Sequence, residues 1–327
     1  MKILVTGGAG YIGAHAVYAL IEQNYEVVVI DNFTTGHRSN LHPKARYYQV
    51  DLRDEAALKR VFTNEPDIKA IMHFAGAIVV SESVQQPLDY FDNNLCGVKT
   101  LLAVANQFQI QHLVFSSTAA VYGEPRSIPI REEDATQPIN PYGASKLAAE
   151  WLIQAWAKAH GGHYVIFRYF NVAGAHASGQ IGIKSHKLTH LVPAVLQAAL
   201  TNSTVQIFGS DYPTQDGSCI RDFIHVDDLV QAHILGLQWT IKHNQSNTFN
   251  LGSGRGYSVL EVCQTVENVL QTKLARQLNP RRAGDPAVLL ADTARVTTVL
   301  NWKPRADLAQ IIHSEYQFRQ QLLKTRR

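Results

Sequence analysis

The chain opens with a short apolar run, Ile3–Val5, followed at once by the glycine-rich stretch "TGGAGYIGAH". Gly7, Gly10 and Gly13 are spaced three residues apart, and the pattern after them is helical. A loop of this kind between a strand and a helix can turn tightly and bring backbone N–H groups close to a pyrophosphate at the positive end of the helix. The opening therefore predicts a dinucleotide-binding βαβ unit.

The first half of the chain repeats this alternation of strand and helix. Five short apolar runs lack polar alternation, as strands buried on both faces do: Ile3–Val5, Val27–Ile30, Ala70–Phe74, Leu113–Phe115 and Tyr164–Phe167. Stretches with helical spacing lie between them, including one from Leu88 to Ala105. The alternation predicts an α/β fold with a Rossmann-type, doubly wound parallel sheet.

The rhythm changes after about Asn171, where Gly, His, Ser and Lys become frequent. We expect residues 1–175 to form the NAD-binding Rossmann domain, with a later segment, about 222–246, packing back on it. Residues 176–327 should form a smaller, mixed α/β lobe. A ligand cleft between the two lobes is expected.

An acidic residue, Asp31, ends the second predicted strand, eighteen residues after Gly13. A carboxylate at this place holds the hydroxyls of an adenosine ribose and repels a 2′-phosphate. The sequence therefore favours NAD over NADP.

Composition excludes several classes of protein. The formal net charge is only +3, and no dense basic face of the kind that binds nucleic acid is apparent. No apolar run approaches the roughly 18 residues that a membrane span needs. Because a predicted strand follows directly in the start "MKILVTGG", we expect no signal peptide. The three cysteines, Cys96, Cys219 and Cys263, are widely spaced and odd in number. We expect a cytoplasmic protein that binds neither nucleic acid nor membranes.

The stretch "NPYGASK" places Tyr142 and Lys146 on one face of a predicted helix, with Asn140 as N-cap and Pro141 at the first helical position. Such a pair can be a solvated surface contact. Beside a nicotinamide, however, a phenol is a useful proton carrier. Bringing its pKa from about 10 to about 7 takes roughly 4 kcal/mol, which Lys146 and the oxidised nicotinamide could supply.

Longer motifs decide between these interpretations. They are "VTGGAGYIGAH", "HFAG", "YFDNN", "FSSTAAVYG", "NPYGASK", "RYFNVAGAH", "NLGSG", "RRAGD" and, most specifically, the stretch from Ile207 to Leu229. In these the chain resembles the extended short-chain dehydrogenases/reductases, and among them the UDP-galactose 4-epimerase family, nearly from end to end. The resemblance implies reversible inversion at C4 of UDP-galactose and UDP-glucose through a transient 4-keto sugar, with tightly bound NAD.

The resemblance also implies roles for individual residues. Tyr142 would be the general base and acid at the 4-hydroxyl, Lys146 would lower its pKa and hold the nicotinamide ribose, and Thr118 would relay the proton. The expected NAD contacts are Gly7, Gly10, Tyr11, Ile12, Gly13, Asp31, Asn32, Asp51, Leu52, Phe74, Ala75, Gly76, Asn93, Thr118, Tyr142, Lys146 and Tyr169. The expected contacts of the nucleotide sugar are Asn171, His190, Leu191, Ile207, Phe208, Arg221, Arg282 and Asp285.

The same comparison separates related chemistries. Nucleotide-sugar dehydratases carry an Asp-Glu pair where this chain has Ala119 and Ala120, which favours epimerisation. Leu289 stands where relatives place either a bulky aromatic or a small residue, so the preferred sugar stays open. The alternatives are UDP-N-acetylhexosamines, UDP-pentoses, another oxidoreductase reaction on a nucleotide sugar, or a non-enzymatic nucleotide sensor.

Further differences from relatives concern the site and the surface. Ile78 stands where some relatives have Lys, and Phe223 where Tyr is common. Relatives form homodimers through the helices that begin near Pro87 and Pro141, and we expect the same here.

Two other patterns have simpler explanations. His186 and His190 are four residues apart, as in metal-binding helices, but no convincing third ligand accompanies them, so no metal is predicted. Asp227 and Asp228 could be paired catalytic carboxylates, but their place at the start of a predicted helix favours a structural role.

Overall fold

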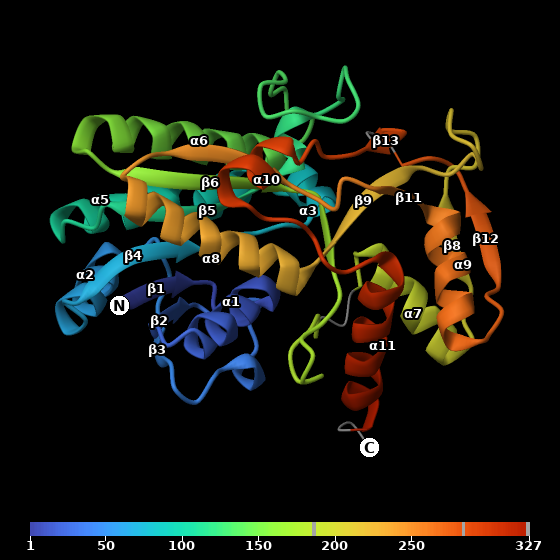
Figure 1. Cartoon of the computed structure of the whole chain (residues 1–327), viewed down its shortest axis with the longest axis horizontal. Coiled ribbons are helices and arrows are strands. Elements are labelled where there is room, and N and C mark those ends of the chain that lie inside the picture. Colours follow the sequence, from blue (N-terminus) through green and yellow to red (C-terminus); the bar gives the residue numbers. More distant parts are fainter. Residues whose placement is uncertain (185–187, 283–284, 325–327) are drawn as a thin grey trace. The chain divides into compact units, whose positions relative to one another are not determined.

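The computed structural model describes residues 1–184, 188–282 and 285–324 (Figure 1). The chain divides into two compact units by its internal contacts. Unit 1 contains Met1–Gly123, Ala135–Tyr169 and Val230–Phe249; unit 2 contains Glu124–Asp134, Phe170–Leu229 and Asn250–Arg327. The chain therefore crosses between the units several times.

Within the described residues, unit 1 is built on a seven-stranded sheet. In spatial order its strands are β10 (Asn247–Leu251), β6 (His163–Tyr169), β5 (His112–Thr118), β4 (Ile68–His73), β1 (Lys2–Thr6), β2 (Glu26–Asp31) and β3 (Arg46–Gln49). The pairings from β6 to β3 are all parallel. This order is that of the Rossmann fold, and the predicted fold class is confirmed.

The sequence missed β3. Its residues, "RYYQ", are polar and aromatic and do not form the continuous apolar run that marked the other strands. As the edge strand, β3 is paired only with β2, so its side chains are partly exposed and its composition is less constrained.

Helices cover both faces of this sheet (Figure 1). They are α1 (Tyr11–Glu22), α2 (Glu55–Asn64), α3 (Val80–Gln85), α4 (Pro87–Phe91), α5 (Gly97–Gln107), α6 (Pro141–His160) and most of α8 (Val226–His243). On one face, Phe62, Leu101 and Ile153 of α2, α5 and α6 share a core with strand residues. On the other, Gly236 of α8 packs closely against Phe167. Burial on both faces explains why the strands lack polar alternation.

The helix predicted from Leu88 to Ala105 is not one regular helix. A π-helical turn, Asp92–Cys96, lies between α4 and α5. The π-helical turn contains one more residue than an α-helical turn, so the residues before it no longer share a face with those after it. Leu88 is therefore 82% exposed, although its spacing placed it on the apolar stripe. The same turn buries Asn94.

Unit 2 is mixed and has shorter strands. Its strands are β7 (Asn171–Ala173), β8 (Val205–Phe208), β9 (Ile220–His225), β11 (Gly256–Ser258), β12 (Arg276–Asn279) and β13 (Val288–Leu289). β9 pairs with β11 in antiparallel and with β7 and β13 in parallel orientation, and β8 pairs with β12. Its helices are α7 (Leu191–Thr201), α9 (Val259–Leu270), α10 (Ala294–Leu300) and α11 (Leu308–Lys324).

Helix α9 begins with a capping box at Ser258. The Ser258 hydroxyl accepts from the N–H of Glu261, and the Glu261 carboxylate accepts from the N–H of Ser258.

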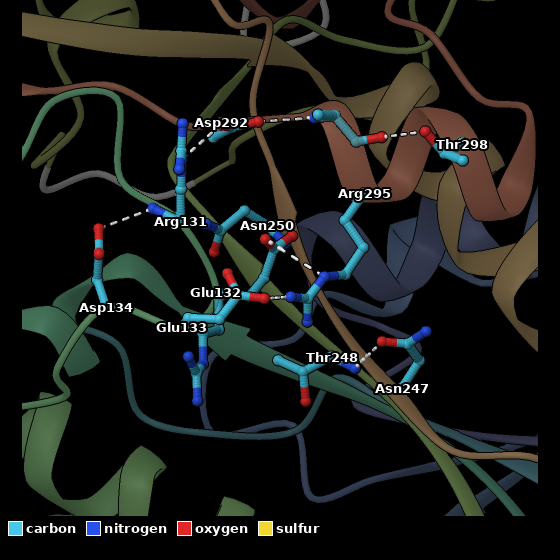
Figure 2. A network of polar contacts seen from close by, with 12 residues as sticks. Arg131, Glu132, Glu133, Asp134, Asn247, Thr248, Asn250, Asp292, Arg295 and Thr298 are labelled. Carbon is cyan, nitrogen blue, oxygen red and sulfur yellow. Dashed lines mark hydrogen bonds and ion pairs between the residues drawn. The ribbon is translucent and has the colours of Figure 1, made fainter.

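A polar network joins the segment Glu124–Asp134 to the rest of unit 2 (Figure 2). The backbone of Ile130 bonds to that of Leu290 and Asp292 on either side of an isolated β-bridge. Arg131 pairs with Asp292 at 3.3 Å, and Glu132 accepts from the N–H of Asn250 at 2.8 Å. These long-range contacts explain why a segment that interrupts unit 1 in sequence belongs to unit 2. No motif in the sequence indicated it.

Asp228 has a structural role at the start of α8. Its carboxylate accepts from the N–H groups of Arg305 and Ala306, each at 2.9 Å, and its carbonyl accepts from the indole N–H of Trp302. This agrees with the structural interpretation of Asp228. Among the described residues, no helix is long and apolar enough to cross a membrane.

Candidate active site

The glycine loop follows β1 and ends in α1, as the sequence predicted. Gly10 is the N-cap of α1 and has no side chain to occupy the helix terminus. A Cβ on Gly13 would lie 2.1 Å from the carbonyl oxygen of Gly7, so only glycine permits this turn. The first N–H groups of the helix, from Tyr11 onward, have no carbonyl of their own helix to bind. The loop is therefore a cradle that fits a pyrophosphate.

Two carboxylates lie at the carboxyl end of β2 and just after β3. Asp31 is buried at the end of β2 and accepts from the N–H groups of Ala9, at 3.0 Å, and Phe33, at 2.8 Å. It thereby connects the glycine loop to β2 and keeps lone pairs for hydroxyl donors. Asp51 accepts from Asn32 at 3.1 Å and pairs with Arg53, whose guanidinium holds the pKa of Asp51 well below its usual range.

Tyr142 lies in the first turn of α6. The predicted helix start is confirmed: the Asn140 side chain accepts from the N–H of Gly143 at 2.8 Å, and Pro141 occupies the first turn. A Cβ on Gly143 would lie 2.5 Å from the carbonyl oxygen of Ala120, so glycine allows the start of α6 to approach the turn after β5 closely. Thr118 ends β5 and hydrogen-bonds the Tyr142 phenol. Both side chains are buried.

Lys146 lies one turn further along α6 on the same face and is also buried. Its Nζ lies 4.5 Å from the centre of the Phe115 ring, and a Cβ on Gly76 would be 3.6 Å from it. Burial lowers the pKa of Lys146 to about 8, and the charge of Glu150 raises it in part. An amine of this kind is still mostly protonated at pH 7.

Burial raises the pKa of the Tyr142 phenol, and the hydrogen bond with Thr118 lowers it in part. From the sequence, a lowered pKa was expected, caused by Lys146 together with a cofactor charge. Of the two effects on this phenol within the chain, burial is the larger. Its activation near pH 7 therefore needs additional positive charge.

Sequence reasoning missed Asn94, which is buried in the π-helical turn. Its side chain accepts from the N–H of Ala77 at 2.8 Å and donates to the Ala77 carbonyl and the Ser145 hydroxyl, each at 3.0 Å. It thus holds the segment after β4, which includes Phe74, Ala75 and Gly76, against α6. The signal was present in "YFDNN", but only the structure shows which of the two asparagines, Asn93 or Asn94, points inward.

All the predicted catalytic and cofactor residues belong to unit 1. Among these residues, Leu52 directly follows Asp51 after β3, and Tyr169 is the last residue of β6. Burial and the negative charge of a Tyr142 phenolate raise the pKa of Tyr169. The structure therefore brings most of the predicted residues to the carboxyl ends of β1 to β6, where doubly wound sheets bind ligands. The others are Asn93 in the π-helical turn and Tyr142 and Lys146 in α6.

The predicted residues for the nucleotide sugar belong to unit 2. Arg221 pairs with Asp285 at 3.1 Å and also donates to the carbonyls of Ile220 and Pro286. The Arg282 guanidinium stacks 4.0 Å from the centre of the Phe208 ring. Two arginines with forked, permanent charge are thus held beside an aromatic ring and a carboxylate.

The remaining predicted residues of this set are arranged differently. Asn171 in β7 donates to the carbonyl of Asp222 at 3.2 Å, and Ile207 is buried in β8. His190 is exposed as the N-cap of α7, and Leu191 is the first residue of that helix. His186 lies outside the described residues. Among those that are described, no three His, Cys, Asp or Glu side chains form a group that could hold a metal ion.

The three positions where the sequence departs from relatives have distinct environments. Ile78 is 53% exposed after β4. Phe223 is buried in β9, and Leu289 is half-buried in β13.

The Rossmann strand order, the glycine cradle and the buried Tyr142–Lys146 pair define the class of dinucleotide-dependent oxidoreductases and isomerases. The model of the NAD dependent epimerase/dehydratase family matches residues 3–252. The chain belongs to this family.

Individual relatives agree over nearly the whole chain. A UDP-glucose 4-epimerase of Lacticaseibacillus casei is 50% identical over 309 residues, 94% of this chain and 93% of that protein. The crystal structure of a UDP-glucose 4-epimerase from Stenotrophomonas maltophila, with bound NAD and formylated UDP-arabinopyranose, has a TM-score of 0.96 and 38% identity and covers 99% of both chains. A UDP-Glc/GlcNAc 4-epimerase from Campylobacter jejuni has a TM-score of 0.86 and 39% identity, covering 98% of this chain and 99% of that one.

Proposed function

We propose that the chain is an NAD-dependent UDP-glucose 4-epimerase, which interconverts UDP-galactose and UDP-glucose. The observation that carries the proposal is the buried arrangement of Tyr142, Lys146 and Thr118 at the end of β5 and the start of α6. It is supported by relatives that bear this name, one of which is 50% identical along 94% of the chain.

NAD fits the unit 1 residues for two reasons. The glycine loop is free of the side chain that any other residue at Gly13 would place in it, and Asp31 offers lone pairs to ribose hydroxyls. The Gly7–Gly13 loop would hold the pyrophosphate, Asp31 and Asn32 the adenosine ribose, Asp51 and Leu52 the adenine, and Lys146 the nicotinamide ribose. Phe74–Gly76, Asn93 and Tyr169 would border the remainder. When bound, NAD supplies the acceptor and then the donor of the C4 hydride, so the sugar passes through a 4-keto form.

The protein's own contribution to the chemistry is proton transfer. Tyr142 removes the proton of the 4-hydroxyl and, once the sugar has turned to present the opposite face of C4 to the hydride, returns a proton to the 4-oxygen, with Thr118 as the relay. Lys146 is a positive charge one helical turn away and favours the phenolate. Its pKa of about 8 keeps it charged at neutral pH.

Tight binding should reside in the nucleotide end, because the sugar must turn between the two half-reactions. Arg221 and Arg282 would meet the diphosphate, Phe208 with Ile207 would border the base, and Asp285 would hold the ribose. Asn171, His190 and Leu191 would contact the sugar or its phosphate. Arginine suits two neighbouring phosphates because its planar fork donates two parallel hydrogen bonds.

A second candidate is 4-epimerisation of UDP-N-acetylhexosamines, since one relative is named a UDP-Glc/GlcNAc 4-epimerase and Leu289 is neither small nor aromatic. UDP-pentoses are a further possibility, because a related structure holds formylated UDP-arabinopyranose. A non-enzymatic sensor would not need the proton-transferring pair.

The test is to incubate the purified protein with UDP-galactose, with and without added NAD, and to resolve the product sugars. We expect UDP-glucose to form in at least one of the two incubations, without net release of NADH. UDP-N-acetylgalactosamine and UDP-arabinopyranose in parallel assays rank the substrates. Tyr142→Phe should lower kcat by about 10²–10⁴-fold, with NAD binding retained. Wild-type turnover in this variant would contradict the assigned role, and absence of UDP-glucose in both arms would reject the function.

The same proposal includes a homodimer in the cytoplasm. Val84, Leu88 and Trp151, on α3, α4 and α6, are 62%, 82% and 60% exposed, and a depression of about 510 Å³ is lined by residues of α5 and α6. Exposed apolar side chains gathered in this way are typical of protein interfaces. Light scattering should give twice the chain mass, and Trp151→Glu should shift the mass toward the monomer. The free Cys96, Cys219 and Cys263 suit a reducing compartment.

A further inference from the structure

Glu150 is the third member of one face of α6. It follows Tyr142 and Lys146 at the same four-residue interval, and it is fully buried. A carboxylate in a core is costly unless other groups compensate for its lost hydration. The proton transfer assigned to Tyr142 and Thr118 gives Glu150 no part, so its burial needs a separate explanation.

The compensation comes from β5 and β6. Arg168 donates from Nε to both Glu150 oxygens, at 3.1 and 3.2 Å, and from Nη2 at 2.6 Å. The Ser117 hydroxyl donates to the same carboxylate, and Arg168 Nη1 donates to the Tyr122 phenol at 3.0 Å. Glu150 is therefore held on two sides, by a charged fork and by a hydroxyl.

The register of the sheet places these partners next to the candidate catalytic groups. Ser117 is paired with Arg168 across β5 and β6, and the next pair along is Thr118 with Tyr169. Glu150 thus connects α6, which carries Tyr142 and Lys146, to the strand that carries Thr118. A shift of this contact would change the separation between α6 and the end of β5.

Glu150 also acts on Lys146 electrostatically. Burial alone would lower the pKa of Lys146 further, and the Glu150 charge opposes this. The Phe115 ring in β5 lies 4.5 Å from the ammonium, and buried His73 in β4 is near enough to be affected by its charge. The Asn94 side chain and the ammonium both border Gly76. His73 has its pKa lowered by burial and by Lys146, so it is neutral near pH 7. Glu150 is the negative charge that acts on Lys146 from its own helix.

We propose that Glu150 is a positioning residue for the reaction: clamped by Arg168 and Ser117, it fixes the charge and the place of Lys146, and with them the Tyr142–Thr118 contact. It touches neither substrate nor cofactor. The inference rests on the proposed function, since Lys146 matters only if it serves the cofactor and Tyr142.

The experiment compares the wild type with Glu150→Gln, Glu150→Asp and the double variant Glu150→Gln/Arg168→Met. The amide keeps the shape of the side chain and removes its charge, Asp keeps the charge, and the double variant avoids leaving an unpaired guanidinium in the core. Glu315→Gln in α11 is the matched control, because Glu315 is also a fully buried glutamate near an arginine but lies in unit 2. Folding of each variant is checked by circular dichroism and Tm.

Two pH profiles are recorded for every protein that folds. One is kcat/KM for UDP-galactose and the other is the Kd of NADH measured by fluorescence, which needs no turnover. We expect the alkaline limb of both profiles to move to lower pH by about one unit in Glu150→Gln, because Lys146 then loses its proton earlier. The double variant should move less, and Glu150→Asp and Glu315→Gln should keep the wild-type limb.

Every outcome of these measurements either supports the positioning role of Glu150 or overturns it. An unmoved limb in folded Glu150→Gln overturns the proposal, and so does a pure loss of kcat with the limb in place. If Glu150→Gln fails to fold, the limb of the double variant is compared with that of the wild type instead, and an unmoved limb there overturns the proposal. If neither variant folds, Glu150 serves the fold alone and the proposal is rejected. A further result is that the wild type binds NADH, and the alkaline limb of NADH binding moves in Glu150→Gln, while the wild type does not convert UDP-galactose. That result would reject the proposed function and leave the positioning role standing.

Discussion

Glu150 in unit 1 and Glu315 in unit 2 are both fully buried beside an arginine, and the two pairs are built differently. In unit 1, Glu150 and Arg168 come from α6 and β6 and make three hydrogen bonds, with Ser117 as a further donor to the carboxylate. In unit 2, Glu315 and Arg319 are neighbours on α11, 2.8 Å apart, in a contact without the direction of a good hydrogen bond. Within the described residues, neither oxygen of Glu315 has a hydrogen-bond partner.

The difference appears in the electrostatics. Burial raises the pKa of Glu315 to about 7, well above its ordinary value, although Arg319 lowers it in part. An ion pair alone does not compensate for lost hydration; several well-directed donors do. The pair of unit 1 therefore depends on its arginine, whereas the glutamate of unit 2 can take up a proton instead.

The largest effect should come from removing the arginine of unit 1. Arg168→Met leaves Glu150 in the core without its charged partner, and we expect a loss of about 3–5 kcal/mol in the free energy of unfolding. Urea denaturation at pH 6 measures it. Arg319→Met is the matched variant and should cost clearly less, because Glu315 is protonated at that pH. Equal losses would show that the two pairs are equivalent.

Removing the charge of Glu315 should stabilise the protein. Because the folded pKa of about 7 lies above the unfolded value, the folded state binds more protons between about pH 4.5 and 7, and stability falls as the pH rises through that window. Glu315→Gln removes this penalty. We expect a gain on the order of 1–3 kcal/mol at pH 8 that vanishes near pH 4.5. A constant gain at all pH values would point to packing instead.

His73 in unit 1 should give a pH dependence of the opposite sign. Burial and Lys146 lower the pKa of His73 to about 3. Between about pH 6.5 and 3, His73 is therefore protonated in the unfolded chain and neutral in the folded state. Stability should fall as the pH falls, by up to about 1.4 kcal/mol per pH unit from this group. Urea titrations of His73→Asn should show a shallower acid slope. His160→Asn, at the exposed end of α6, is the control and should leave the slope unchanged.

The smallest effect should come from an ion pair at the surface. Arg131 lies 3.3 Å from Asp292, and its side chain is 69% exposed (Figure 2). Arg131→Gln should cost about 0.5 kcal/mol or less at low salt and nothing at 0.5 M NaCl, about the concentration at which such charges are screened. A salt-independent loss above about 1 kcal/mol would mean that the network of Figure 2 acts as a cooperative unit.

Much of unit 1 could be predicted because its signals are local. Buried strands need continuous apolar runs, a glycine cradle needs Gly7, Gly10 and Gly13, and the start of α6 needs a cap such as Asn140. Each requirement is written within a few neighbouring residues. The edge strand β3 was missed for the same reason, since its partly exposed residues meet no strict requirement.

The sequence by itself determined the fold class, the family and the residue types of the candidate site, since these follow from local spacing and from motifs. Only the tertiary structure decided that Asn94 faces inward, that Glu124–Asp134 belongs to unit 2, and that Glu150 joins α6 to β5 and β6. These facts depend on contacts between residues far apart in the chain. The cost or gain of burying a polar group is set by such distant partners, and no local pattern records them.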